Sequence, residues 1–123
     1  MSISRLTAEA EKVVADVQKR LPPDIRALAG KVPVVFYDWP TEEILGDEFD
    51  PDILGMFVGE AHDVTEGLTN AVPSHILLFL ENILDEAEGD LGTYRKEVRV
   101  TYLHELGHYL GWDEDDLDER GLA

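Results

Sequence analysis

The chain has 123 residues, of which 44% are hydrophobic, no cysteine, and a formal net charge of −17 at pH 7. The length and the apolar fraction predict one globular domain, residues 1–123, with a single hydrophobic core. The absence of cysteine excludes disulfides and thiolate metal ligands. The negative charge makes nucleic acid and anionic membranes poor partners, because phosphate binding needs a basic surface.

The same charge favours peptides or proteins with basic surfaces as partners. No apolar run approaches the roughly 20 residues of a membrane span. The N-terminus lacks the apolar centre of a signal peptide. We therefore expect a cytoplasmic protein.

The N-terminal part of the chain predicts two helices and one strand. Residues 4–21 repeat Leu and Val at spacings of three and four, the period of a helix with one apolar face, and Ser4 or Thr7 is the expected N-cap. A Pro-Pro pair breaks this helix, and a shorter helix follows over residues 24–29. Residues 32–37 are β-branched and aromatic, and the proline near their start predicts either an edge strand or the first position of a strand.

The central part of the chain alternates short elements with acidic and glycine-containing stretches. Thr41 is expected to cap a short helix. The acidic stretch at 47–52 lacks the Gly and Glu of a calcium-binding EF-hand, so we interpret it as a solvated loop. Residues 54–60 predict a strand whose glycines indicate a bulge or a close backbone approach. The loop predicted over 61–73 is long for a small domain. Its His62 is either an exposed histidine or a metal ligand, and we favour the exposed histidine.

The last part of the chain begins with its most apolar strand. Residues 74–80 predict this buried strand. A helix is expected over residues 81–88, with a glycine at its end. A long helix then follows over 94–110, and Thr93 is its expected N-cap.

A His-Glu-x-x-His sequence lies in the long helix. His104 and His108 are four residues apart, so their imidazoles lie on one helical face and can bind one Zn²⁺. Glu105 is next to them around the helix and can take a proton from a water molecule on the metal. The competing interpretation is a surface helix with two solvated histidines, which the apolar residues of this segment disfavour. Several carboxylates follow within reach of the same metal: Asp113, Glu114, Asp115 and Asp116.

The long helix separates these candidate ligands from an apolar arc. At 100° per residue, Leu103, Leu106 and Leu110 lie on the side opposite the histidines. Gly107 lies between the two faces and predicts close packing against a strand. Gly111 is expected to end the helix, because glycine adopts the left-handed conformation without steric cost.

The segment HELGHYLG at 104–111, followed by Glu114 and Asp116-Leu117, resembles the minimal zincin-like metallopeptidases, which are short bacterial proteins. The resemblance implies an α+β fold, in which a small sheet of three or four strands packs against an N-terminal helix and the C-terminal motif helix. It also implies Zn²⁺ as the cofactor, with His104, His108 and Glu114 as ligands and Glu105 as the catalytic base. Asp113 ranks second and Asp116 third as the carboxylate ligand.

Three functions remain open at this point. The resemblance implies a zinc-dependent hydrolase of peptide bonds, to which an extended peptide can bind at the sheet edge beside the motif helix. The second function is a zincin-like binding protein that hydrolyses little and engages basic partners through its acidic surface. The third is a module that buffers or senses metal. For a hydrolase, Tyr94 or His75 is a candidate donor to the developing oxyanion.

Overall fold

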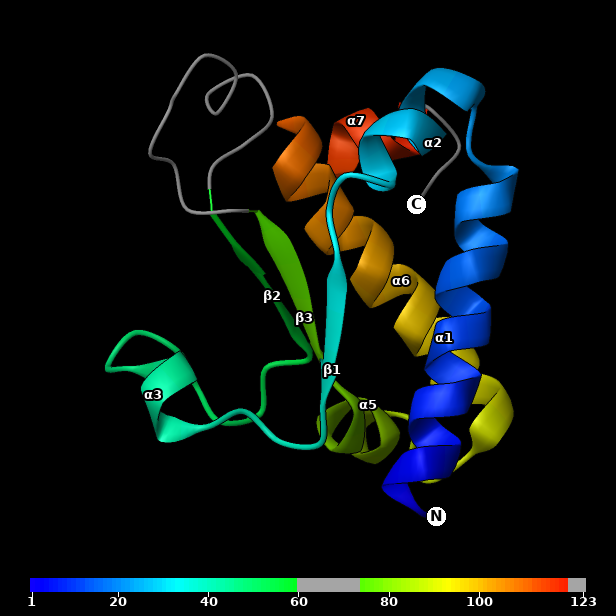
Figure 1. Cartoon of the computed structure of the whole chain (residues 1–123). Helices are drawn as coiled ribbons and strands as arrows, with labels where there is room; N and C mark the ends of the chain where they lie inside the picture. The colour runs from blue at the N-terminus through cyan, green and yellow to red at the C-terminus, as the bar shows by residue number, and fades with distance from the viewer. Residues whose placement is uncertain (60–73, 120–123) are drawn as a thin grey trace.

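The computed structural model describes residues 1–59 and 74–119, with Glu114 described by its backbone alone. These residues form an α+β fold, which confirms the predicted fold class (Figure 1). The predicted loop over 61–73, with His62, lies outside the described residues. In chain order the elements are α1 (Ile3–Arg20), α2 (Pro23–Ala29), β1 (Val34–Tyr37), α3 (Glu42–Leu45), β2 (Gly55–Val58), β3 (His75–Phe79), α5 (Leu80–Glu86), α6 (Leu91–Leu110) and α7 (Glu114–Glu119).

The described strands form one sheet in the order β1-β3-β2. β1 runs parallel to β3 with Val34 opposite Ile76, and β2 runs antiparallel to β3 with Phe57 opposite the same residue. The most apolar strand is therefore the central one, which agrees with the predicted burial, and the proline-led strand is at an edge, one of the two positions expected for it. Helix α6 packs against β2 and β3, while α1 and α5 pack against α6 (Figure 1). The hydrophobic core lies between the helices and this face of the sheet.

The side chain of Ser2 caps α1 by accepting a hydrogen bond from the Arg5 backbone N–H at 3.2 Å. The prediction of Ser4 or Thr7 as the N-cap is therefore wrong. Both lie inside the helix, where the Thr7 hydroxyl donates to the Ile3 carbonyl at 2.8 Å. The sequence offers several hydroxyl side chains here, and only the packing of the helix decides which one lies at its boundary.

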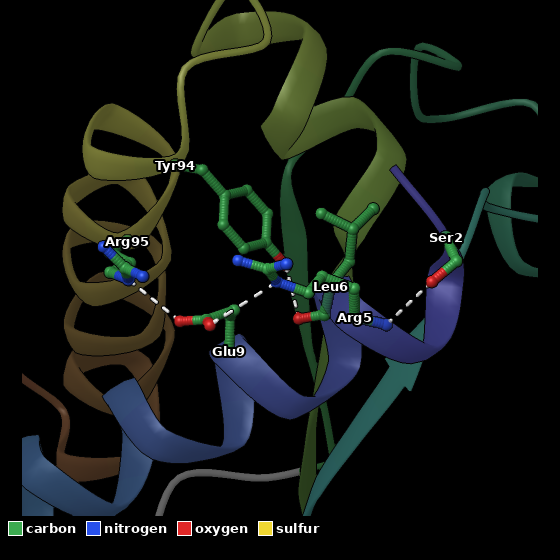
Figure 2. A network of polar contacts seen from close by, with 6 residues as sticks. All are labelled: Ser2, Arg5, Leu6, Glu9, Tyr94 and Arg95. Carbon is green, nitrogen blue, oxygen red and sulfur yellow. Dashed lines mark hydrogen bonds and ion pairs between the residues drawn. The ribbon is translucent and has the colours of Figure 1, made fainter.

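Polar contacts fasten α1 to the first half of α6 (Figure 2). Tyr94 is fully buried, and its hydroxyl donates to the Leu6 carbonyl at 2.8 Å. Glu9 accepts a hydrogen bond from Arg95 Nε at 2.9 Å and lies 3.8 Å from Arg5 Nε. The hydrogen bond from Arg95 holds the pKa of Glu9 below its ordinary value. These contacts fix the axis of the helix that carries the two motif histidines.

Helix α6 begins and ends at residues suited to those positions. Asp90, rather than the predicted Thr93, is the N-cap, and its Oδ2 accepts the Thr93 backbone N–H and hydroxyl, both at 2.8 Å. At the other end Gly111 has a φ of 74°, and the Trp112 N–H donates to the Gly107 carbonyl at 2.8 Å. This pattern is a Schellman motif, so the predicted glycine end of the helix is confirmed.

Asn82 on α5 holds the segment that leads into β2. Its amide nitrogen donates to the Pro51 carbonyl at 2.8 Å and to the Ile53 carbonyl at 2.9 Å. The side chain is buried, with 7% of its surface exposed. Asn82 therefore helps to set where β2 begins relative to the helices.

Replacing Asn82 with alanine is expected to lower the free energy of unfolding by about 2 kcal/mol, because two carbonyl groups lose their donor. Urea denaturation followed by tryptophan fluorescence measures this change. The Asn82→Asp variant keeps the size of the side chain but has no N–H to donate, so it should destabilise the protein at least as much. An aspartate variant as stable as the wild type would contradict the role of these hydrogen bonds.

None of the helices in the described part of the chain is long and apolar enough to cross a membrane. The cytoplasmic location expected from the sequence stays a prediction.

Candidate metal and catalytic site

The two motif histidines lie together in the last two turns of α6, the orange part of that helix in Figure 1. The ring centroids of His104 and His108 are 4.9 Å apart. His104 is half-buried and His108 is exposed. Their position one helical turn apart gives both imidazoles access to the same side of the helix, as one metal ion requires.

Glu105 lies beside this histidine pair and is buried, with 7% of its surface exposed. Its Oε1 is 3.9 Å from Nδ1 of His108. Burial raises the pKa of Glu105, while the nearby His104 and the backbone N–H of Phe57 in β2 act in the opposite direction. A carboxylate with a raised pKa is a better proton acceptor than a solvated one.

The outer strand β2 brings its backbone to this helix. The Leu54 carbonyl accepts a hydrogen bond from the Phe79 N–H at 2.9 Å. Hydrogen-bonded and non-hydrogen-bonded pairs alternate along antiparallel strands, so the N–H and C=O of Phe57 point away from β3. The Phe57 backbone therefore faces the outer edge of the sheet.

The side chains of β2 on the α6 side alternate with those on the other side of the sheet. The Phe57 ring lies 6.4 Å from the His108 ring and 6.1 Å from the Tyr109 ring, measured between centroids. A Cβ atom on Gly55 would lie only 2.8 Å from Cγ2 of the buried Thr101. The close backbone approach predicted for the glycines of this strand is confirmed at Gly55, because only glycine lets β2 come this near to α6.

Gly107 provides a second close contact, but not the one predicted. A Cβ atom there would lie 3.2 Å from Cδ1 of Leu117 and 3.3 Å from the Trp112 carbonyl oxygen. Gly107 therefore packs against the turn after α6 and against α7, and the prediction that it packs against a strand is wrong. The Schellman turn reverses the chain, so the closest neighbour of this glycine comes from its own C-terminal side.

Two of the candidate carboxylate ligands form a reciprocal cap at the start of α7. The Asp116 N–H donates to Oδ1 of Asp113 at 2.8 Å, and the Asp113 N–H donates to Oδ2 of Asp116 at 3.0 Å. This is the geometry of a capping box, with aspartate at both positions. One oxygen of each carboxylate is thus used by the backbone.

In the described part of the chain, no three His, Asp or Glu side chains gather where they could hold a metal ion. The donors that are described fit zinc, since two neighbouring imidazoles with a carboxylate beside them are a common zinc environment. The choice of Glu114 as the third ligand stays a prediction.

Neither residue considered as an oxyanion donor lies in a suitable place. The Tyr94 hydroxyl is buried against α1, where it donates to the Leu6 carbonyl. His75 pairs with Val58, so it faces the side of the sheet opposite Phe57 and the motif histidines. The prediction that Tyr94 or His75 has this role is therefore wrong.

Sequence reasoning missed the contribution of β2 to the site. Phe57 acts through its backbone N–H, and no sequence pattern identifies a residue by the direction of its amide. The glycine at position 55 was a usable signal for a close approach, although not for its partner Thr101. The Asp113-x-x-Asp116 spacing was also a signal, since a carboxylate three residues after an N-cap is the pattern of a capping box.

Comparison with known proteins adds one finding to this geometry. The sequence profile described as zincin-like metallopeptidase matches residues 29–122, from the end of α2 to beyond α7. The match includes β1, β2, β3 and the whole of α6. No curated protein matches the chain.

Proposed function

Because this chain belongs to the zincin-like metallopeptidase family, we propose that it is a zinc-dependent peptidase that hydrolyses peptide bonds with Glu105 as its catalytic base. The observation that carries this proposal is the placement of one buried carboxylate beside two imidazoles on the same helix. A purely structural glutamate in a helix would be expected to face solvent or a cation.

The proposed metal ligands are His104, His108 and Glu114. The first two supply neutral nitrogen donors, and the third would supply a charged oxygen from the first residue of α7. When bound, zinc supplies a Lewis acid that polarises the peptide carbonyl. The Gly107 contact with Leu117 supports this assignment, because it holds the start of α7 against the end of α6.

Glu105 has two tasks in the proposed reaction. It accepts a proton from the water molecule whose oxygen attacks the carbonyl carbon of the peptide. It then gives that proton to the nitrogen of the leaving amine as the C–N bond breaks. Burial favours both tasks, since it raises the pKa of the carboxyl group and excludes bulk water from its surroundings.

We propose that the substrate is an extended, basic peptide. The outer edge of β2 offers backbone groups to such a peptide next to α6. There is no Lys or Arg between residues 32 and 94 or between 100 and 119, and these stretches hold the three described strands and α7. Nine of the ten cationic side chains lie instead at positions 5–31 and 95–99. This separation of charge attracts a basic peptide to the side with the sheet edge.

The test is hydrolysis of a library of capped peptides by the full chain with added zinc. We expect cleavage, fastest for peptides rich in Lys and Arg, and loss of cleavage with a chelator. The Glu105→Gln variant is expected to retain zinc but to lose activity at least ~100-fold, the scale of general acid–base catalysis. As a matched control, Glu86→Gln removes an exposed carboxylate on α5 and should keep full activity.

If the zinc-loaded chain cleaves none of the peptides, binding without hydrolysis replaces the peptidase function as the proposal. The protein would then be a zincin-like binding protein for basic partners, and the same charge separation supports that function. Binding of basic peptides without cleavage would be its expected result.

A further inference from the structure

We propose that the outer edge of β1, with the hollow beside it, binds an extended segment of a partner protein in which Lys or Arg alternates with apolar residues. This edge lies on the opposite side of the sheet from β2, the strand that packs beside the motif histidine His108. The inference goes beyond the proposed function, because it uses neither zinc nor hydrolysis.

The first observation is the direction of the β1 backbone. The Ile76 N–H donates to the Pro33 carbonyl at 2.9 Å, and Val34 is paired with Ile76 in the parallel register. Successive residues of a strand direct their backbone groups to alternate sides, so Val34 and Phe36 point theirs away from β3. A further strand can pair with these groups. The strand also has none of the charged side chains that protect an exposed edge from pairing.

The second observation is a hollow of about 320 Å³ beside this edge, between β1, α1 and the end of α2. Its volume is at the lower end of ligand pockets, so it suits one long side chain. Val34 and Phe36 line it, whereas Val35 between them is 38% exposed on the other face of the sheet. A strand added to β1 therefore directs every second side chain into the hollow and the others beside Val35.

The third observation is the chemistry of the hollow. Its lining is mostly apolar and includes Val14 and Ala15 of α1. Among the described residues that line it, Glu11 carries the only charge. Gln18 also lines it, and its Nε2 donates to the Tyr102 hydroxyl at 3.0 Å, which leaves the amide oxygen as an acceptor. Lys and Arg match this lining, because their aliphatic stems pack on apolar surface while their charged heads reach the acceptors.

A second copy of this chain is the competing occupant, since two edge strands can pair with each other. Two chains with a net charge of −17 repel each other, however. The edge of a second copy also has no Lys or Arg to offer to Glu11. A basic partner segment satisfies both the edge and the carboxylate, so we assign the edge to such a partner.

Amide exchange measures whether a peptide lies along β1. Selective ¹⁵N-phenylalanine labelling of the full chain gives four signals, of which three report on different strands. The probe is a capped peptide of alternating Val and Lys, with a chelator to prevent hydrolysis. We expect exchange at Phe36 to slow at least ~10-fold, because its N–H then donates to the peptide. The Phe79 N–H, which donates to the Leu54 carbonyl at 2.9 Å, is the internal standard, and Phe57 reports on binding at β2.

Two pairs of variants test the hollow and the backbone separately. Ala15→Trp fills the hollow from an exposed position of α1, and Ala8→Trp adds the same bulk at an exposed position that does not line it. Calorimetry should show peptide affinity ~10-fold lower for Ala15→Trp than for Ala8→Trp. Val34→Pro removes the outward N–H, which an edge strand tolerates, whereas Val34→Ala keeps it. Affinity should be roughly five-fold lower for the proline variant.

The Glu11→Gln variant tests the charge in the hollow. It should weaken binding of the Val and Lys peptide roughly three-fold, the effect of an exposed ion pair. A peptide with Gln in place of Lys should bind the variant and the wild type equally. If the Lys peptide also binds both equally, the assignment of a basic partner is wrong.

Unchanged exchange at Phe36 with peptide bound, equal affinities within both pairs of variants, or no peptide binding would each overturn the proposal. If circular dichroism shows that Val34→Pro unfolds, the two tryptophan variants decide. Exchange at Phe36 that slows with rising protein concentration and without peptide would assign the edge to a second copy instead. A chain that cleaves peptides but fails these tests contradicts this inference alone, and one that passes them but cleaves nothing loses only the peptidase function.

Discussion

Replacing both His104 and His108 with alanine is expected to abolish zinc binding. The two imidazoles are the nitrogen donors of the proposed site, and their ring centroids lie 4.9 Å apart on one face of α6. Loss of both leaves carboxylates alone, which bind Zn²⁺ weakly compared with a mixed nitrogen and oxygen site. Each single substitution should weaken binding at least ~100-fold, the upper end of the effect of removing a group that only supports a ligand.

Isothermal titration calorimetry of the metal-free chain measures these affinities. The His75→Ala variant is the control, because it removes a histidine from the other side of the sheet and should bind zinc like the wild type. Alanine favours helices and the two motif histidines are half-buried or exposed, so α6 should remain folded, which circular dichroism can verify. Equal uptake of zinc by the wild type and the double variant would contradict the site assignment.

Replacing Glu114 with glutamine is expected to reduce zinc affinity strongly, while the same change at Glu105 leaves it nearly unchanged. Two neutral imidazoles and one carboxylate give a zinc site with a net charge near +1, whereas an amide oxygen is an uncharged and weaker donor. We expect the Glu114→Gln variant to lose roughly 10- to 100-fold in affinity. Calorimetry and metal analysis after dialysis both measure this loss.

Glu105 is expected to behave differently because its proposed task is proton transfer. Glutamine keeps the size and one acceptor oxygen of the side chain, so the variant should retain zinc and lose hydrolysis. Glu119→Gln, at the end of α7, is the control for the loss of a charge near the site. Loss of zinc from Glu105→Gln combined with full retention by Glu114→Gln would reverse the two assigned roles.

Substitutions at Asp113 and Asp116 also test which carboxylate is the third zinc ligand. Their reciprocal hydrogen bonds cap α7, so substitution by asparagine should affect the stability of that helix before it affects the metal. If either asparagine variant loses more zinc than Glu114→Gln, the choice of the third ligand is wrong.

Much of the local structure was determined by the sequence itself. The four-residue spacing of His104 and His108 puts them on one helical face wherever that helix lies, because the helical repeat is a property of the backbone. The end of α6 followed from Gly111, since a positive φ of 74° is easily adopted by glycine alone. The strand order was only partly predictable: the apolar run of β3 indicated a buried strand, and Pro33 allowed an edge strand as one of two positions.

The tertiary structure decided which groups meet at the site. Phe57 and Glu105 are far apart in the chain, and they come close because β2 lies antiparallel at the sheet edge against α6. Gly107 packs against Leu117, although its place on the helix suggested a strand as neighbour. Periodicity and caps depend on residues a few positions apart, so a sequence reveals them. The direction of one edge amide depends on the register of two strands and the packing of a helix, which no local pattern contains.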